Sequence, residues 1–508
     1  MSDAHDVTDL ATAQVLIATL RQEIARSQQE ITTLRQQLDA LCRRLYGKTS
    51  ERVSPDQLRL AFAQLANEPG PATDPIEMDS GERPGPEKRR RARRPTGRRP
   101  LPAHLPRRRV EIDVPEADKT CACGHAKTRI GETVAEKLEY VPASLHVIET
   151  ARLKYACAHC HTGVVEAAAP PQAVEKSLAA EGLLAQVVVA KYVDHLPLYR
   201  QSRIFLREGV DLSRSTLCGW VADVATALAP IGDELRRQIV GASYLHTDDT
   251  TITILEDGVG SRTGRLWTYL DRLRSQVVFD ATETRARAGP EAVLADFTGD
   301  LQADAYTGYD ALFATGRIRE IGCWAHTRRG FVDAFQTDVR AALMVALIQR
   351  LYQVERDAAE WSAEARQAVR REQSVSILAQ IATEREALAA TVLPKSPLGE
   401  AVRYLTNQWA ALQRYVEDGH LGIDNNPAEN QLRGIAVGRK NWLFAGSLEG
   451  ARRAALLYSL VQSCALIGVP PFDYLRDVLL RVATHPQHRI AELTPKGWAA
   501  TFGRRAAA

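Results

Sequence analysis

Long apolar runs are missing from this sequence of 508 residues. The two longest candidates, residues 183–190 and 341–348, are much shorter than the roughly 20 residues that span a bilayer. The N-terminus also lacks the basic and apolar regions of a signal peptide. We therefore expect a cytoplasmic protein with no membrane partner. A chain of this length exceeds one hydrophobic core, so three or more folded units are expected.

Cysteine is scarce, with 8 residues in the whole chain. That number is too small for a disulfide scaffold, and a reducing compartment would prevent one. Two close pairs stand out, Cys121 with Cys123 and Cys157 with Cys160. Two such pairs can supply the four thiolates of a closed, structural Zn²⁺ site, and free buried cysteines are the alternative. Three nearby histidines could replace one thiol: His125, His159 and His161.

A strong net charge is absent too, since the formal charge is only +3. The charge is unevenly distributed, however, because Lys88–Arg109 contains eleven Lys or Arg residues and no acid. Such a block stays unfolded by itself and commonly binds nucleic acid, although a solvated linker without a partner fits as well. We predict a flexible basic linker over residues 50–109, much of it rich in Pro and Gly.

Apolar residues near the N-terminus recur every seven positions. The first line is Ile17, Ile24, Ile31, Leu38 and Leu45, and the second is Leu20, Leu34 and Leu41 with a gap at Ser27. Mostly β-branched residues in the first line favour a parallel two-stranded coiled coil. We predict a coiled coil over residues 1–49 that mediates self-association. The alternative is one amphipathic helix folded back on its own chain.

Two folded segments follow the linker. Residues 110–170 contain the paired cysteines and form the predicted zinc-binding module. Residues 171–236 show helical patterns, with a third helix capped by Asp211–Ser213. Short helices joined by a Gly-containing turn fit a helix-turn-helix that binds DNA, and a three-helix unit that only packs fits equally well.

Strand patterns begin after residue 240. Residues 244–253 alternate with a period of two, and shorter strand-like runs lie at 266–270, 276–279, 301–306 and 318–324. Helical patterns dominate afterwards. Strands followed by helices predict a mixed sheet covered by helices, within a multidomain α+β chain.

Acidic side chains interrupt two of these strands, at Asp248 (or its neighbour Asp249) and at Asp304. A carboxylate in such a strand is costly unless a cation pairs with it, and two on adjacent strands repel each other. Mg²⁺ removes that cost, since it prefers carboxylates together with water and phosphate oxygens. Strand-end carboxylates that simply face solvent are the alternative.

A third acid follows a helix-start signal. Asn426 can cap the helix, Pro427 can be its first residue, and Glu429 its third. Local rules alone therefore favour a capping box in which Glu429 bonds back to the cap amide. Arg433, one turn later, could pair with Glu429.

The chain resembles the large transposases of the insertion-sequence-66 family. The paired-cysteine module carries part of the resemblance, and further motifs follow in family order along nearly the whole chain. They are Arg44–Glu51, Leu101–Pro106, Ile130–Glu132, Leu138–Pro142, His246–Thr250, Leu301–Tyr306, Gly322–Arg329, Asp424–Arg433, Gly438–Gly446 and Tyr458–Leu460.

The resemblance implies an RNase H-like catalytic domain whose triad, Asp248, Asp304 and Glu429, holds Mg²⁺ or Mn²⁺. Asp304 and Glu429 lie 125 positions apart, which implies a helical insertion over 335–417. The catalytic domain then occupies 237–334 and 418–467, and 468–508 is a C-terminal helical segment. Two positions depart from the family pattern: Asp249 stands where Glu is usual, and Cys121 and Cys123 are more closely spaced.

The implied reaction is metal-dependent cleavage and strand transfer at the ends of an insertion sequence. Its partners would be the inverted repeat ends, target DNA and small companion proteins of the same element, with the protein on the nucleoid. Candidates for gripping DNA phosphates are His326, Arg328, Arg329, Arg439 and Lys440. The rival hypotheses are a non-catalytic zinc-containing DNA-binding regulator derived from a transposase, and a general nuclease.

Overall fold

The structure is a computed structural model that describes residues 145–155, 165–256 and 260–503. The predicted coiled coil and basic linker lie outside these ranges, as do the four paired cysteines, Cys121, Cys123, Cys157 and Cys160. The described part of the cysteine module includes two short antiparallel strands, β1 (Lys154–Tyr155) and β2 (Val165–Glu166).

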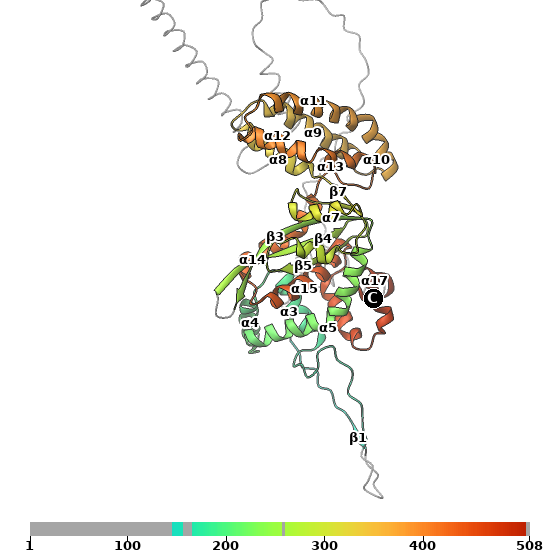
Figure 1. Cartoon of the computed structure of the whole chain (residues 1–508). Helices are drawn as coiled ribbons and strands as arrows, with labels where there is room; N and C mark the ends of the chain where they lie inside the picture. The colour runs from blue at the N-terminus through green and yellow to red at the C-terminus, as the bar shows by residue number, and fades with distance from the viewer. Residues whose placement is uncertain (1–144, 156–164, 257–259, 504–508) are drawn as a thin grey trace, which may run out of the picture. The chain divides into compact units, whose positions relative to one another are not determined.

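A five-stranded sheet lies at the centre of the described chain (Figure 1). Its strands are β3 (Tyr244–Glu256), β4 (Gly260–Asp271), β5 (Gln276–Thr282), β6 (Gly299–Gln302) and β7 (Ile318–Ile321). The order is β5-β4-β3-β6-β7, with antiparallel pairing from β3 to β5 and parallel pairing from β3 to β7. The predicted mixed sheet is confirmed.

Two strands end earlier than the sequence predicts. β6 ends at Gln302, so Asp304 lies beyond it, and the Asp304 carboxylate accepts a bond from the Tyr306 N–H at the next turn. β7 ends at Ile321, and α8 (Trp324–Phe335) begins where a strand residue was expected. The backbone leaves the ladder because Gly322 N–H donates to Ala411 O and Trp324 N–H to Ile423 O.

Three helices precede the sheet, as predicted: α3 (Glu181–Tyr192), α4 (Leu198–Arg207) and α5 (Arg214–Val240). Ser213 caps α5, since its hydroxyl accepts the Thr216 N–H at 3.1 Å. α5 continues to Val240, and its buried residues belong to the same hydrophobic core as the sheet. The packing interpretation therefore accounts for these helices, and a DNA-binding role for them stays a prediction.

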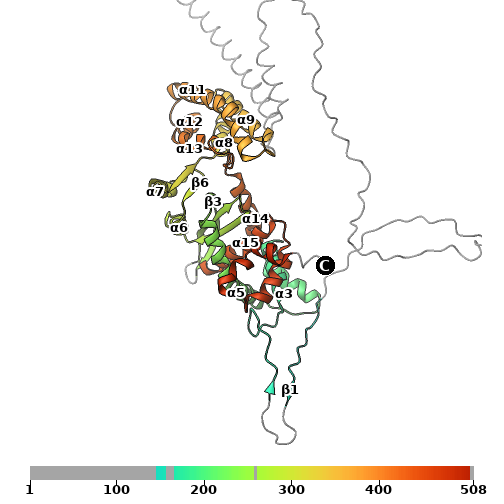
Figure 2. The same cartoon turned by 90° about the vertical axis from the view of Figure 1, so that its right-hand side faces the viewer.

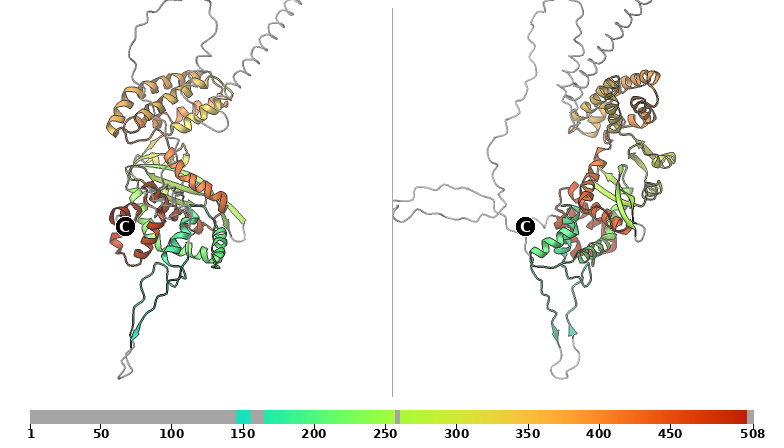
Figure 3. Two further views of the ribbon diagram at one scale, coloured as in Figure 1. Left: turned by 180° about the vertical axis from the view of Figure 1, so that it is seen from behind. Right: turned by 90° about the vertical axis from the view of Figure 1, so that its left-hand side faces the viewer.

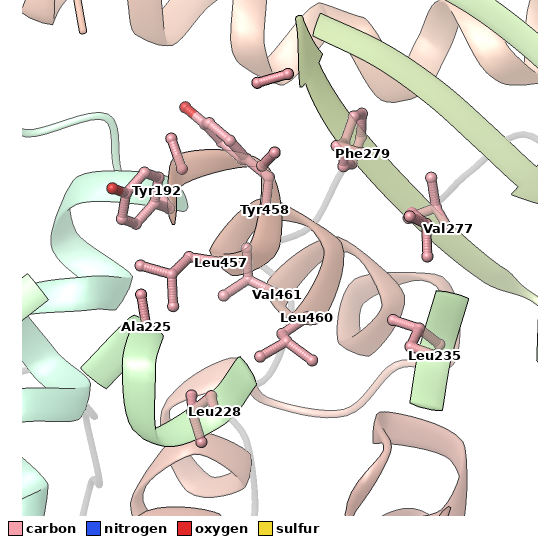
Figure 4. Packing of buried hydrophobic residues seen from close by; sticks show 14 of the residues in the cluster. Tyr192, Ala225, Leu228, Leu235, Val277, Phe279, Leu457, Tyr458, Leu460 and Val461 are labelled. Carbon is pink, nitrogen blue, oxygen red and sulfur yellow. The ribbon is translucent and has the colours of Figure 1, made fainter. Parts of the chain in front are cut away.

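Two later helices are α14 (Asn426–Trp442) and α15 (Leu448–Leu466). Both lie on one side of the sheet (Figures 2 and 3). α15 packs on the edge strand β5, whose Phe279 N–H donates to the Ser459 hydroxyl at 2.8 Å. Tyr458 packs between Tyr192 of α3 and Phe279 (Figure 4), with ring centroids 5.0 and 6.2 Å away. α16 (Pro471–Val482) and α17 (Pro495–Thr501) follow α15.

The helices between β7 and α14 form a bundle with its own hydrophobic core (Figures 1 and 2). α8 begins this bundle, and it contributes Trp324 and Phe331 to that core. The remaining helices lie within the predicted insertion over 335–417, although α8 starts the bundle at Trp324. They are α9 (Ala341–Asp357), α10 (Ala363–Val369), α11 (Val375–Thr391), α12 (Pro397–Asn407) and α13 (Trp409–Gln413). Among the residues that the structure describes, no helix has both the length and the hydropathy of a membrane span.

Candidate catalytic site

The strand register brings Asp248 and Asp304 together. β3 and β6 run parallel, with Tyr244 opposite Asp300 and His246 opposite Gln302. Since side chains on one face of a sheet recur every two residues, the next neighbours on this face are Asp248 and Asp304. Asp248 is inside β3, whereas Asp304 lies just past the end of β6.

Asn425 fixes the start of α14 against β3. This residue is fully buried, and its side-chain amide donates to Thr247 O at 2.8 Å. Its Oδ1 lies 3.2 Å from His246 Nδ1, and its backbone N–H donates to Cys323 Sγ at 3.2 Å. We call these three bonds of Asn425 the Asn425 clamp. Glu429 follows one turn later, so the clamp brings it to the segment of β3 that carries Asp248.

A buried polar network ties the end of the helical bundle to the sheet. Gln302 donates from its amide to Gly322 O and Gly422 O, both at 2.9 Å. Tyr244 donates its hydroxyl hydrogen to Gln302 Oε1 and accepts the Gly422 N–H at 2.9 Å. This network fixes where the chain re-enters the sheet domain, three residues before Asn425.

Asp248 is affected by the other two acids. Burial raises the pKa of its carboxyl to about 7, and the charges of Asp304, Glu429 and Asp249 act in the same direction. A bond from the Asp249 N–H to Asp248 Oδ1, at 2.8 Å, opposes part of this rise. The three predicted triad residues are therefore close enough to interact electrostatically.

Basic side chains face the acids in this site. Asp249 is bound by Arg265 and Arg285, each at 2.9 Å, and Arg285 also lies 3.4 Å from Asp304 Oδ2. Glu429 lies 3.7 Å from His326 Nε2. Arg329 Nη2 lies 3.9 Å from the other oxygen of the same carboxylate.

The capping box that local rules alone favour does not form. The residue that caps α14 is Asn425 rather than Asn426, and its side chain makes no capping bond because β3 and His246 engage it. Glu429 Oε1 is buried and has no hydrogen-bond partner within the described part of the chain. Glu429 is therefore available for a role other than capping.

The donor set suits a hard divalent cation, but the carboxylates are not gathered around one. Within the described ranges, no group of three or more His, Cys, Asp or Glu side chains is placed to hold a metal ion. Oxygen donors of this kind match Mg²⁺ or Mn²⁺, and Glu429 Oε1 has an unmet bonding requirement. Asp248, Asp304 and Glu429 are the side chains that would hold such an ion.

Of the five predicted DNA-contacting residues, His326 lies 3.7 Å from Glu429, and the other four differ in their surroundings. Arg439 attaches α14 to β3, since its Nη1 donates to Thr250 Oγ1 and to the carbonyl and hydroxyl of Thr251. Arg329 is 51% exposed, Lys440 is exposed, and Arg328 is half-buried. A role in gripping DNA stays a prediction for all four, and for Arg439 protein contacts already explain the side chain.

Sequence reasoning missed two side chains of this site. Asn425 precedes the residue that the helix-start rule selects, although it stands within the motif from Asp424 to Arg433. Arg285 lies in the loop after β5, where no periodicity or motif marks it.

Four family models match the chain. The model described as Transposase IS66 family matches residues 176–453, and the IS66 C-terminal element matches residues 459–496. The zinc-finger binding domain of transposase IS66 matches residues 118–161, which contain all four paired cysteines. A leucine-zipper model, described as Transposase C of IS166 homeodomain, matches residues 33–110.

Three proteins of Sinorhizobium fredii (strain NBRC 101917 / NGR234) are similar to most of this chain, and each is described as an uncharacterized protein. y4jD is 34% identical over 487 residues, or 91% of this chain and 93% of y4jD. y4hP is 34% identical over 488 residues, or 91% and 88% of the two chains. y4qI is 34% identical over 508 residues, or 96% and 92%. No solved structure matches.

The mixed sheet and the family matches together support a protein of the transposase class. The chain belongs to the IS66 family of transposases. The zinc-finger match supports structural zinc, and the leucine-zipper match suggests self-association. The leucine-zipper match begins within the heptad pattern and extends over the segment that we predicted to be a basic linker.

Proposed function

We propose that this protein cleaves DNA at the ends of an insertion sequence and joins those ends to a target, with Asp248, Asp304 and Glu429 as its triad. The observation that carries this proposal is the Asn425 clamp, which brings an acid from a distant helix to the strand that holds Asp248. The RNase H-like interpretation of the domain is supported by its mixed sheet and by the long helical bundle before α14.

The three carboxylates would hold divalent cations, Mg²⁺ or Mn²⁺. Ions bound there would activate the attacking water or 3′-hydroxyl and stabilise the leaving oxygen of an in-line displacement. Asp248 must be deprotonated to act as a ligand, so its raised pKa favours metal binding at or above neutral pH. Asn425 and the Gln302 network hold the backbone that positions the two ends of the site.

The exposed face of α14 supports DNA as the substrate. Asn430, Arg433 and Lys440 are exposed on this helix, at spacings of three and seven residues, so they follow one stripe beside Glu429. Amide and cationic side chains are the groups that bind phosphates and base edges, and this stripe contains no acid. We propose that it lies along the DNA end that reaches Glu429.

For the N-terminal modules, we propose that Cys121, Cys123, Cys157 and Cys160 are the ligands of the structural zinc. The helix-turn-helix role of α3–α5 and self-association through the heptad segment belong to the same proposal. The partners would be inverted repeat ends, target DNA and small companion proteins of the element.

Strand cleavage tests the function directly. Purified full-length protein is incubated with Mg²⁺ and DNA that carries the terminal repeats of the element, and nicked and joined products are resolved by electrophoresis. Asp304→Asn should lose cleavage by at least about a hundredfold and keep DNA binding, because it removes a charge that the transition state requires. Asp310→Asn, at an exposed acid on α7 (Asp310–Ala314), is the matched control and should cleave like the wild type.

Three results would contradict the proposal. Unchanged cleavage by Asp304→Asn would remove that residue from the chemistry. Binding without any cleavage by the wild type would favour a DNA-binding regulator, and cleavage that needs no terminal repeat would favour a general nuclease.

A further inference from the structure

A guanidinium group already lies in the acidic site. Arg285 belongs to the loop between β5 and α6 (Ala288–Val293), and its Nε and Nη2 both lie 2.9 Å from Asp249 Oδ1. The same Nη2 lies 3.4 Å from Asp304 Oδ2. One side chain thus bridges a predicted triad acid and an acid whose role the sequence left open.

Asp249 is fully engaged as an anchor. Its side chain is only 3% exposed, and its second oxygen accepts a bond from Arg265 Nη1 at 2.9 Å. To bind a metal, this carboxylate would have to give up its 2.9 Å contacts with two part-buried arginines, Arg265 and Arg285. Asp249 is therefore the ion-pair partner of the two arginines and not a ligand of the cation.

Tyr306 holds Arg285 from the other side. The guanidinium carbon lies 4.2 Å from the centre of the Tyr306 ring, and the Tyr306 hydroxyl donates to the Arg285 carbonyl. The contact with Asp304 is the longest of the set, 3.4 Å against 2.9 Å for Asp249. Since longer hydrogen bonds are weaker, Asp304 is the partner that Arg285 loses first.

We propose that Arg285 is a positioning residue that neutralises Asp304 in the metal-free protein and releases it when a divalent cation binds. It remains anchored on Asp249 and Tyr306 after the exchange. A guanidinium and a divalent cation repel each other and compete for the same carboxylate oxygen, so both cannot hold Asp304 at full strength. The inference rests on the proposed function, because it takes Asp304 as a metal ligand.

Metal affinity, rather than activity, tests this inference. Mn²⁺ is titrated into full-length protein without DNA, and free Mn²⁺ is followed by its electron paramagnetic resonance signal. Arg285→Gln should bind Mn²⁺ at least about threefold more tightly than the wild type, the scale expected for removal of a competing, partly exposed ion pair. Arg287→Gln is the matched control, since Arg287 is two positions away, exposed and paired with Glu291 at 3.7 Å, and it should leave the affinity unchanged.

A second variant distinguishes the loss of the ion pair from misfolding of Arg285→Gln. Arg285→Lys keeps the positive charge but cannot bind Asp249 through two nitrogens, so its Mn²⁺ affinity should lie between those of the wild type and Arg285→Gln. Thermal melting adds a second readout. Without metal, Arg285→Gln should have a lower Tm than the wild type, because Asp249 and Asp304 have lost the guanidinium group. Mn²⁺ should raise the Tm of this variant by more than it raises that of the wild type.

The outcomes separate this inference from the proposed function. Unchanged or weaker Mn²⁺ binding by Arg285→Gln, with Asp304→Asn still weakening it, would overturn the role of Arg285 alone. An Asp304→Asn variant that binds Mn²⁺ like the wild type would remove the proposed metal site, and the inference with it.

Discussion

Asp248 stands at the point where β3 passes from buried residues to the acidic site. Burial raises the pKa of its carboxyl to about 7, and three nearby acids add to the effect. Its neighbour His246 is buried as well, and burial lowers the pKa of that imidazole to about 3, so the ring stays neutral beside Asn425. Ionisation of Asp248 is therefore costly in the metal-free protein.

This cost predicts a pH-dependent stability. The folded protein keeps the Asp248 proton up to about pH 7, whereas the unfolded chain releases it near 3.8. Because the folded state binds more protons within this window, the metal-free wild type loses stability from this group as the pH rises through it. Asp248→Asn cannot ionise, so its free energy of unfolding should rise relative to that of the wild type as the pH increases.

Urea unfolding in the presence of a chelator, at pH steps from about 4 to about 8, measures this difference. Asp296→Asn, at an exposed acid, controls for the loss of one negative charge. A difference between Asp248→Asn and the wild type that does not change with pH would contradict the interpretation.

At the scale of an element, α14 is attached to β3 at three places. Asn425 binds Thr247 at one end, Arg439 binds Thr250 and Thr251, and Ala445 pairs with Ile254 beyond the helix. The helix thus follows the strand over its whole length. Glu429, near the start of α14, is therefore positioned by bonds along the helix as far as its C-terminal end.

Two glycines in α14 give a matched test of this packing. A Cβ on Gly438 would lie 2.8 Å from Trp442 Nε1, 3.0 Å from the Tyr458 hydroxyl and 3.1 Å from His195 Nδ1. A Cβ on Gly434 would have no atom closer than 3.6 Å. Gly438→Ala should destabilise the protein by about 1 kcal/mol or more, because crowding outweighs the gain in helix propensity.

Gly434→Ala should instead stabilise by roughly 0.5 kcal/mol, because it gains helix propensity without crowding. Urea unfolding of both variants measures the two free energies under one condition. Equal effects of the two substitutions would show that the predicted close approach at Gly438 is absent.

Much of each element could be predicted from local pattern alone. The alternation in β3, the cap at Ser213 and the helices of the bundle all follow from residue periodicity and from short-range rules. The end of β7 could not, because Gly322 N–H and Trp324 N–H donate to the carbonyls of Ala411 and Ile423, which are distant in the sequence. Asn425 was missed for the same reason, since its bonding partners lie about 180 positions earlier in the chain.

At the scale of the whole molecule, the described chain has two hydrophobic cores. One joins α3–α5, the sheet, α15 and α16, and the other belongs to the helical bundle. The Gln302 and Tyr244 network connects the end of the bundle to the sheet, so the chain returns to the site at a defined place. A long insertion between Asp304 and Glu429, the second and third acids of the proposed triad, is therefore compatible with one site.

The strand pattern placed Asp304 within a strand, but β6 ends at Gln302 and Asp304 lies just beyond it. Its contact with Arg285 was not predicted, because an arginine in a loop is placed only by the folded chain. Arg285, from the loop after β5, lies 3.4 Å from Asp304 Oδ2.

Anomalous diffraction from crystals of the protein soaked in Mn²⁺ tests the central claim most directly. We predict manganese bound by oxygens of Asp248 and Asp304, with Glu429 completing a second metal position. A manganese peak held by other residues, with none at these three carboxylates, would contradict the account.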